Sequence, residues 1–211
     1  MVRSKVTGEE RSGEEAVSAS SQAITIRAAK GFEELEACVQ LQVATWGYDA
    51  ADIVPRRMFS LAARIGGQVL GAFDEDRLVG FLLALPGVRN GHAYLHSHML
   101  AVVPELRNAG IGRSLKLAQR EDALARGIDL IEWTFDPLVV KNAYLNLNRL
   151  GAIARRYAHD FYGPTSSPLG GGLPTDRLYA EWWIRSERVE RALRGEVPEP
   201  QVQATVIFPP P

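Results

Sequence analysis

Apolar and polar positions follow two different periods along residues 23–194. A period of two predicts strands, and apolar residues three and four positions apart predict helices. In the first half of this region the pattern predicts a strand, two helices and then three strands, at 23–27, 31–46, 55–65, 69–73, 78–85 and 94–103. The polar residues between the second and third of these strands, 74–77, are typical of a hairpin turn.

The second half begins with a tight turn that opens a helix. The pattern predicts a helix, a strand, a short helix, two strands and a short charged helix, at 111–125, 130–135, 142–150, 152–162, 176–184 and 185–194. Pro137 cannot donate to a sheet ladder and ends the second of these elements. Strands mixed with helices in this way predict an α+β (α/β three-layer) fold.

Both ends of the chain differ from this core. Residues 1–22 hold few large apolar side chains, so we expect a disordered arm. The final residues are rich in proline. We therefore expect one domain at 23–190 and a Pro-rich tail at 191–211, and the loop at 163–174 either to be mobile or to lie over a site.

Charge and cysteine content exclude several classes. The net charge of -1 over 211 residues argues against a broad nucleic-acid binder. The single cysteine, Cys38, excludes an internal disulfide framework, and the four histidines lack the spacing of a metal site. We therefore expect no metal. The sequence also lacks a membrane-length apolar run and a secretory h-region, so we expect a cytoplasmic protein.

One stretch carries the candidate chemistry. Arg107-x-x-Gly110-x-Gly112 lies between an apolar strand and an amphipathic helix. Glycines let the backbone approach a bound group, and the first amides of a helix favour an anion. Two positions apart on the preceding strand, His96 and His98 share a face. An anion site beside two titratable groups suggests an enzyme that uses a phosphorylated cofactor. The alternative is that the glycines only make a tight turn.

The motif Leu100-Ala101-Val102-x-Pro104-x-x-Arg107-x-x-Gly110-x-Gly112 closely resembles the acetyl-CoA-binding motif of the GNAT superfamily of N-acyltransferases. The order of elements over 24–184 is also similar to that fold. The runs 133–138, 142–146 and 150–152 resemble a poorly characterised branch of predicted acyltransferases whose members tend to be longer. By that resemblance, 206–211 would be a cut strand.

The resemblance implies a mixed, mostly antiparallel sheet with a splayed central strand pair, flanked by helices. It also implies that acetyl-CoA or another acyl-CoA is the co-substrate. Its pantetheine arm would bind the backbone at 100–102, and the amides of 107–112 would hold the pyrophosphate. The implied cofactor-binding residues are Leu100, Ala101, Val102, Arg107, Asn108, Ala109, Gly110, Ile111, Gly112, Arg113 and Asn142.

The catalytic assignments follow from the same comparison. His96 and His98 are similar in spacing to a water-linked histidine base of arylalkylamine N-acetyltransferases, and histidine suits a base near neutral pH. The alternative is that they are structural. The family's acid, a tyrosine four residues before the helix-ending glycine, falls on Leu147 here. Tyr144 lies one turn away and is the candidate acid, with water or the product ammonium as alternatives.

For the acceptor, we expect Trp46 and Tyr48 to line the pocket, and Glu132 and Asp136 to bind the amine or orient a histidine. The alternatives are that Glu132 faces solvent and that Asp136 caps the following helix.

These features predict a CoA-dependent N-acyltransferase. It would move an acetyl or other short acyl group to a primary amine of a small metabolite by direct attack, without a covalent relay on the protein. The alternatives are succinyl-CoA or another donor with an amino-acid acceptor, and a non-catalytic acyl-CoA-binding module. We expect no nucleic-acid or membrane partner, and a homodimer is an open alternative.

Overall fold

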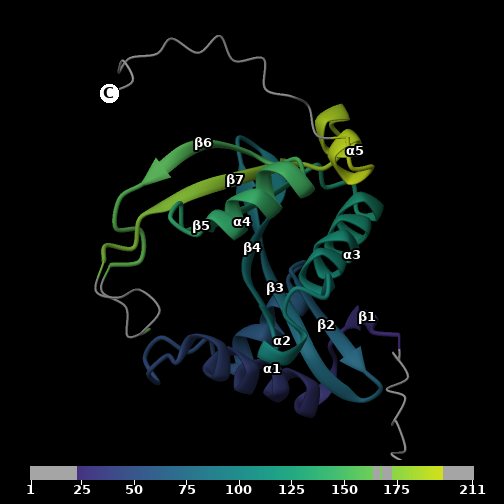
Figure 1. Cartoon of the computed structure of the whole chain (residues 1–211). Coiled ribbons are helices and arrows are strands. Elements are labelled where there is room, and N and C mark those ends of the chain that lie inside the picture. The colour runs from purple at the N-terminus through teal and green to yellow at the C-terminus, as the bar shows by residue number, and fades with distance from the viewer. Residues whose placement is uncertain (1–22, 164–166, 168–172, 197–211) are drawn as a thin grey trace, which may run out of the picture.

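The computed structural model describes residues 23–163, 167 and 173–196. These form a seven-stranded sheet with the strand order β1-β2-β3-β4-β5-β7-β6 (Figure 1). The strands are β1 (Thr25–Ala28), β2 (Gln68–Asp74), β3 (Arg77–Arg89), β4 (His92–Val102), β5 (Leu130–Phe135), β6 (Ile153–Ala158) and β7 (Arg177–Trp183). The α-helices are α1 (Gly31–Trp46), α2 (Arg56–Arg64), α3 (Ile111–Ala125), α4 (Val140–Ala143) and α5 (Glu187–Leu193).

Neighbouring strands are antiparallel at every position in the sheet except between β4 and β5, which run parallel. These two strands pair only at Leu95↔Ile131 and His96↔Glu132. Beyond these pairs β4 continues to Val102 and β5 to Phe135 without pairing with one another. The sheet therefore opens there into a V, which confirms the predicted mostly antiparallel sheet with a splayed central pair.

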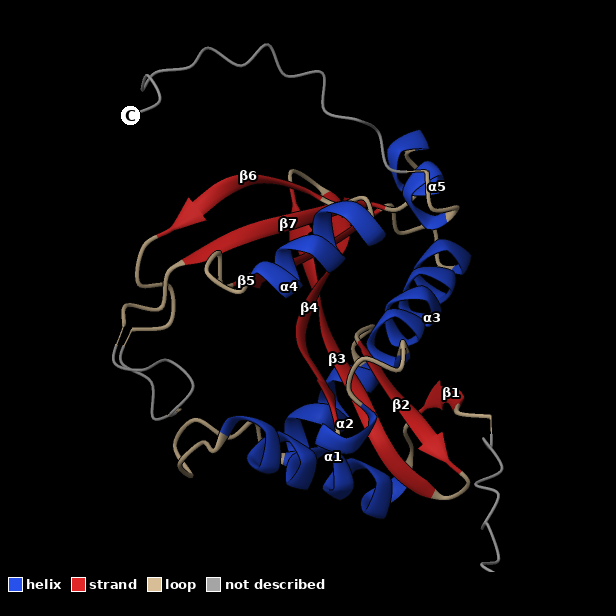
Figure 2. Ribbon diagram, viewed as in Figure 1, coloured by secondary structure: helices blue, strands red, loops and turns tan. Residues whose placement is uncertain are grey.

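Helices cover both faces of the β1–β4 half. α1 and α2 pack on β2, β3 and β4, while α3 packs on the same strands from the other side (Figure 2). The buried core between these layers includes Phe59, Phe81, Leu82, Leu95 and Leu115. Burial of such side chains contributes roughly 1.5–3 kcal/mol each, so this core fixes β4 between the two helical layers.

Most predicted elements are present with bounds close to those expected, and three differ. The predicted strand 78–85 continues to Arg89 in β3. The predicted helix 142–150 begins at Val140 and becomes a π-helix over Tyr144–Arg149. The predicted strand 152–162 ends at Ala158, because Asp160 has a left-handed φ of 45° that turns the chain.

The predicted arm at 1–22 and the cut strand at 206–211 lie outside the described residues, as does most of the Pro-rich tail. The domain limits therefore stay a prediction. Among the helices of the described residues, none is long and apolar enough to cross a membrane.

Candidate active site

The turn between β4 and α3 contains the predicted anion site. A short 3-10 helix, Pro104–Leu106, follows β4, and Asn108 and Gly110 then adopt left-handed φ values of 71° and 85°. Ser114 makes the first helical bond of α3, donating its backbone N–H to the Gly110 carbonyl at 3.0 Å. The three N–H groups of residues 111–113 precede it and have no acceptor within the helix. The turn therefore offers donors and the positive end of a helix dipole.

Two glycines of this turn differ in what the backbone requires. Gly110 needs its positive φ, which disfavours any other residue. Gly112 is helical, and a Cβ there would meet only Leu100 Cδ2, at an ordinary 3.5 Å. Glycine inside a helix costs about 1 kcal/mol relative to alanine. The fold alone does not explain glycine at 112, and its role in cofactor binding stays a prediction.

The two candidate phosphate arginines point in different directions. Arg107 donates from Nε to the Val102 carbonyl at 3.1 Å, beside the turn. Arg113 donates from Nη2 to the Leu193 carbonyl at the end of α5, at 3.2 Å, and its Nε is buried without a partner. Arg107 is thus the better placed of the two, and phosphate binding by either stays a prediction.

A β-bulge redirects the side chains of β4. The register to β3 passes from Leu83↔Met99 to Ala84↔Ser97, so His98 is the extra residue. Ser97 contacts α3 through Lys116, and Leu100 also faces α3, at Gly112. Positions three apart would face opposite ways in a regular strand, and the bulge removes that alternation. Simple alternation did not predict it.

Both histidines lie on the face opposite α3, with ring centroids 6.3 Å apart. His98 lines a cavity of about 280 Å³, here called the His98 cavity. Its other walls come from the segment between α1 and α2, from α2 and from β3: Ala51, Asp52, Ile53, Val54, Pro55, Met58, Leu83 and Leu85. A histidine at the edge of an apolar cavity, beside the splay, suits a base that meets an incoming amine.

Burial keeps both imidazoles neutral. It lowers the pKa of His98, and it is the largest cause that lowers the pKa of His96 to about 4, with smaller contributions from the charges of His98, Lys116 and Arg156. A neutral imidazole has a free lone pair at neutral pH, which a proton acceptor needs.

Glu132 is buried beside His96 and is 3% exposed, so the alternative that it faces solvent is wrong. Its Oε1 lies 4.0 Å from His96 Nδ1. Its Oε2 accepts from Arg89 at 2.8 Å and from Arg156, which also pairs with Glu181. The carboxylate is thus held by two guanidiniums, which explains why it fits inside the sheet. Arg156 and Glu181 are members of the site that sequence reasoning missed.

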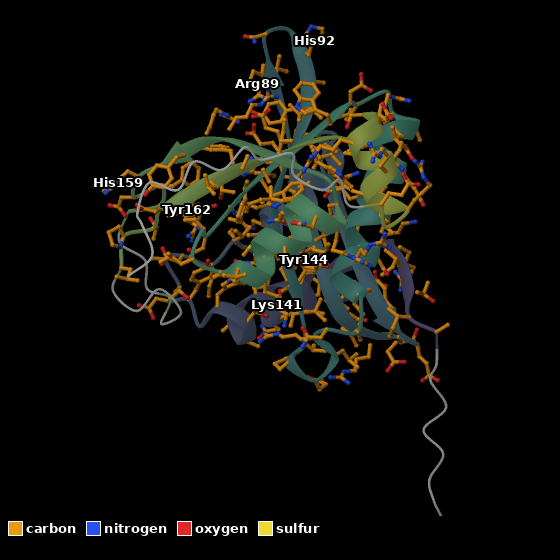
Figure 3. All side chains as sticks on the ribbon, turned by 45° about the horizontal axis from the view of Figure 1, so that its top comes forward. Arg89, His92, Lys141, Tyr144, His159 and Tyr162 are labelled. Atoms are coloured by element: carbon orange, nitrogen blue, oxygen red, sulfur yellow. The ribbon has the colours of Figure 1, made fainter. Side chains whose placement is uncertain are left out.

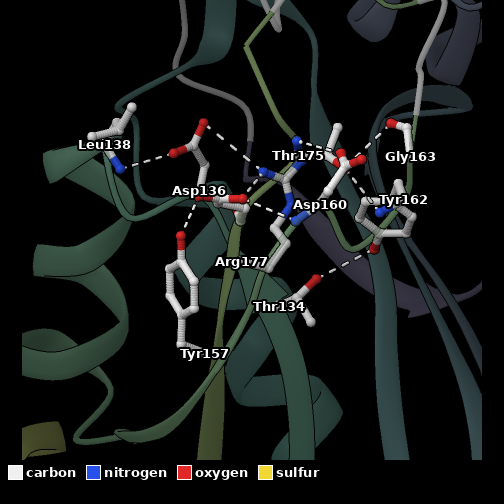
Figure 4. Close-up of polar contacts among 10 residues, drawn as sticks. Thr134, Asp136, Leu138, Tyr157, Asp160, Tyr162, Gly163, Thr175 and Arg177 are labelled. Atoms are coloured by element: carbon white, nitrogen blue, oxygen red, sulfur yellow. Dashed lines mark hydrogen bonds and ion pairs between the residues drawn. The ribbon is translucent and has the colours of Figure 1, made fainter.

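Asp136 does not cap a helix, which corrects that alternative. It accepts from the Leu138 backbone N–H at 2.8 Å and lies 3.9 Å from Arg177, while Val139 stands at the start of α4 without a side-chain cap (Figure 4). The chain between β5 and α4 turns before the helix begins, and the Asp136 carboxylate accepts its backbone hydrogen bond within that turn.

Hydrogen bonds hold both ends of the connection from β6 to β7. Asp160 accepts from the Thr175 backbone and hydroxyl, both at 3.1 Å, and Tyr162 is linked to Thr134 at 3.3 Å (Figure 4). From within the connection, Ser167 donates to the Trp46 carbonyl at 2.7 Å. This places part of the predicted loop beside the end of α1, at the predicted acceptor side.

Trp46 and Tyr48 stack on one another at 5.9 Å, and Trp46 meets Phe81 edge-on. Neither lines the His98 cavity itself, although the segment that follows them does. Burial raises the pKa of Tyr48. Their role in acceptor binding stays a prediction.

Tyr144 is 54% exposed and lies next to Lys141 at the start of the π-helix (Figure 3). Asn142 is exposed as well, whereas Asn146 one turn on is buried. The turn that ends at Gly151 does not bring a phenol to the cavity wall. A role for Tyr144 as the acid and for Asn142 in cofactor binding both stay predictions.

A comparison with protein-family models matches residues 35–144 to the acetyltransferase (GNAT) family. The sequence search against curated proteins found no match.

Solved structures show the same fold at low identity. The chain is similar to Arabidopsis thaliana NAA60 in complex with acetyl-CoA, at 16% identity and a TM-score of 0.63, over 78% of this chain and 100% of that one. It is also similar to the ribosomal-protein-S18-alanine N-acetyltransferase from Escherichia coli, at 16% identity and a TM-score of 0.56, over 78% and 97%. A third is the ribosomal-protein-alanine N-acetyltransferase from Brucella melitensis, at 20% identity and a TM-score of 0.58, over 74% and 98%.

Proposed function

Because the chain belongs to the acetyltransferase (GNAT) family and is therefore an acyl-CoA-dependent N-acetyltransferase, we propose that it transfers an acetyl or other short acyl group to a primary amine bound in the His98 cavity. The observation that carries this proposal is the position of His98, which lines the cavity from the strand beside the splay. The anion site at the start of α3 lies at the far end of the same strand.

The turn fits the diphosphate of CoA, since the helix amides at 111–113 lack internal acceptors and Gly112 leaves space beside them. Bound acetyl-CoA supplies the thioester carbonyl that an amine can attack. In this proposal Arg107 adds a charge-assisted hydrogen bond to a phosphate oxygen. The backbone of residues 100–102, which does not pair with β5, holds the pantetheine arm.

The histidines act on the amine. His98, directly or through a water shared with His96, takes a proton from the incoming ammonium. The free nitrogen then bonds to the thioester carbonyl carbon, the carbon–sulfur bond breaks, and sulfur leaves as the CoA thiolate. The thiolate takes the second proton of the product nitrogen through water or Tyr144. No covalent relay on the protein is needed, and Cys38 is buried, which raises its pKa to about 12.

A small metabolite amine is the first candidate acceptor. The cavity volume of about 280 Å³ is near the lower end of ligand pockets, which span ~300–1,000 Å³. Its walls are apolar apart from His98 and Asp52, and the Asp52 carboxylate would attract an ammonium. The amino terminus of a peptide is a second candidate, because two of the similar structures are named as ribosomal-protein alanine N-acetyltransferases.

The test is release of free thiol from acetyl-CoA in the presence of an amine panel that includes small amines, amino acids and alanine-terminated peptides. We expect amine-dependent thiol release with at least one class, together with mass gain of that amine by one acetyl group. Binding of acetyl-CoA without thiol release across the whole panel would contradict transfer to these amines. The cytoplasmic location and the homodimer stay predictions from the sequence.

A further inference from the structure

Lys116 on α3 is a buried lysine that the proposed mechanism does not use. It is 5% exposed. Its Nζ donates to Ser97 Oγ at 2.8 Å and to Gln119 Oε1 at 3.1 Å, and it lies 3.7 Å from the centre of the Trp133 ring. Lysines are almost never fully buried unless they are paired.

The position of this amine is tied to the splay. The last paired residues of β4 and β5 are His96 and Glu132, so Ser97 and Trp133 are the first residues after the strands separate. Lys116 contacts both of them. Its ammonium therefore lies across the closed end of the V, on the α3 face, while His98 approaches the V from the opposite face.

Within the described part of the chain, no carboxylate oxygen lies within 4 Å of Lys116 Nζ. A chain of hydrogen bonds connects Lys116 to the Asp122 carboxylate only through two side-chain amides. Gln119 donates to Gln68 at 3.0 Å, and Gln68 donates to Asp122 at 2.6 Å. An ammonium without a buried counter-ion is costly, and burial lowers the pKa of Lys116 well below its usual range. The fold alone gains little from a lysine here, since an apolar side chain of similar length would avoid that cost.

A carboxylate brought in by the donor would supply the missing counter-ion. The carbonyl that is attacked must lie near His98, the proposed base, and Ser97 is one residue closer to the end of the V, about 3.3 Å along the strand. An acyl group whose carbonyl is at the bulge thus extends toward Lys116 by a few bond lengths. An acetyl group ends one carbon beyond that carbonyl, whereas a short dicarboxylic acyl group carries a carboxylate farther along in the same direction.

We propose that Lys116 binds the terminal carboxylate of a short dicarboxylic acyl group, such as malonyl or succinyl, so that the protein accepts such acyl-CoA donors in preference to acetyl-CoA. This inference rests on the proposed function, because it assumes that acyl-CoA occupies the V. The transfer step is unchanged: the amine bonds to the thioester carbonyl carbon, CoA leaves with sulfur, and the far carboxylate stays ionised and unreacted.

The test compares dissociation constants of succinyl-CoA, malonyl-CoA and acetyl-CoA by calorimetry, for the wild-type chain and for Lys116→Met. We expect the wild type to bind the better dicarboxylic donor about 10- to 100-fold more tightly than acetyl-CoA, the range that a charge-assisted hydrogen bond supplies. In Lys116→Met this ratio should fall below about threefold. Lys141→Met, which removes an exposed lysine on α4, is the matched control and should keep the wild-type ratio.

Lys116→Gln serves as a second variant, because it keeps a polar end for Ser97 without the positive charge and so remains informative if the methionine variant folds poorly. A melting temperature at or above that of the wild type shows that either variant is folded. A wild-type ratio near one, with acetyl-CoA bound, overturns the role of Lys116 and leaves the proposed function intact. A dicarboxylic preference that survives both substitutions overturns it as well. Failure of every acyl-CoA to bind contradicts the proposed function itself.

Discussion

Leu100 owes its orientation to one extra residue in β4, His98. Without the bulge, the residues that follow it would face the opposite layers, and Leu100 would point away from α3. With the extra position, His98 faces the His98 cavity while Leu100 faces α3. Bulges are frequent beside active sites because they redirect a side chain in this way.

Replacing His98 by alanine should lower kcat by about 10²- to 10⁴-fold, the usual contribution of a general base. Burial lowers the pKa of this imidazole, so activity should be lost as pH falls through a value below the ordinary ~6.5 and be flat from there to neutral pH. Steady-state rates across pH 4–8 would show this.

His92→Ala, at the exposed tip of the β3–β4 hairpin (Figure 3), is the control and should retain the wild-type rate. Wild-type turnover in the His98 variant at neutral pH would rule out His98 as the base. If the wild-type rate instead fell with decreasing pH around a midpoint above pH 7, the base would not have a lowered pKa, and this too would contradict the assignment.

Gly112 separates what the fold needs from what the ligand needs. Gly112→Ala should stabilise the unliganded protein by about 0.4–1 kcal/mol, because alanine restricts the unfolded chain and the added Cβ makes only an ordinary contact. The same methyl group should weaken acyl-CoA binding by at least ~10-fold, since it occupies the approach to the helix amides. Urea unfolding and calorimetry measure the two effects.

Glu121→Ala, on an exposed position of the same helix, should leave acyl-CoA affinity unchanged. An affinity of Gly112→Ala within twofold of the wild type would show that the ligand does not approach the start of α3.

At the scale of elements, β5 contributes Glu132 to the join between the two halves of the sheet. The residue pairs with His96 in the last step of the β4–β5 ladder. Its carboxylate accepts hydrogen bonds from Arg89 on β3 and from Arg156 on β6. Three strands on both sides of the splay are thus tied to one buried carboxylate.

Glu132→Gln should lower the free energy of unfolding by about 1–3 kcal/mol at pH 7. The loss is smaller than for a fully buried ion pair, because both arginines are partly exposed and Arg156 keeps Glu181. Asp129→Asn breaks the exposed pair with Arg185 and should cost less than about 1 kcal/mol. Equal effects of the two substitutions in urea unfolding would contradict a buried role for Glu132.

The sequence predicted elements best where local signals mark their ends. The helix 31–46 has the expected bounds because Gly47 adopts the left-handed cap, and the Gly turn opens α3 at Ile111 as expected. The bulge at His98 and the π-helix at Tyr144–Arg149 were not predicted, because no local residue pattern in the sequence marks either of them.

Across the whole molecule, contacts between distant segments decide the rest of the site. The turn at 107–112 is local, and its glycine spacing together with the flanking strand and helix patterns predicted it. Glu132 with Arg156, and Lys116 with Ser97, join different elements that only the folded sheet brings together. No periodicity marks a lysine on the buried side of α3, so its position emerged only from the structure.

The two halves of the sheet meet through few β4–β5 pairs, and a ligand in the V would touch both. Ligand binding stabilises the folded state by ~2.7 kcal/mol at 100 times the dissociation constant. Binding should therefore slow hydrogen exchange at backbone amides that have no hydrogen-bond acceptor in the unliganded protein.

Hydrogen–deuterium exchange with and without acetyl-CoA therefore tests the central claim most directly. We expect marked slowing at the amides of residues 111–113, which lack helical acceptors, and at those amides of residues 98–102 that face the side of β4 left unpaired by β5. Saturating acetyl-CoA that leaves exchange at both segments unchanged would contradict the placement of acyl-CoA in the splay and at the start of α3.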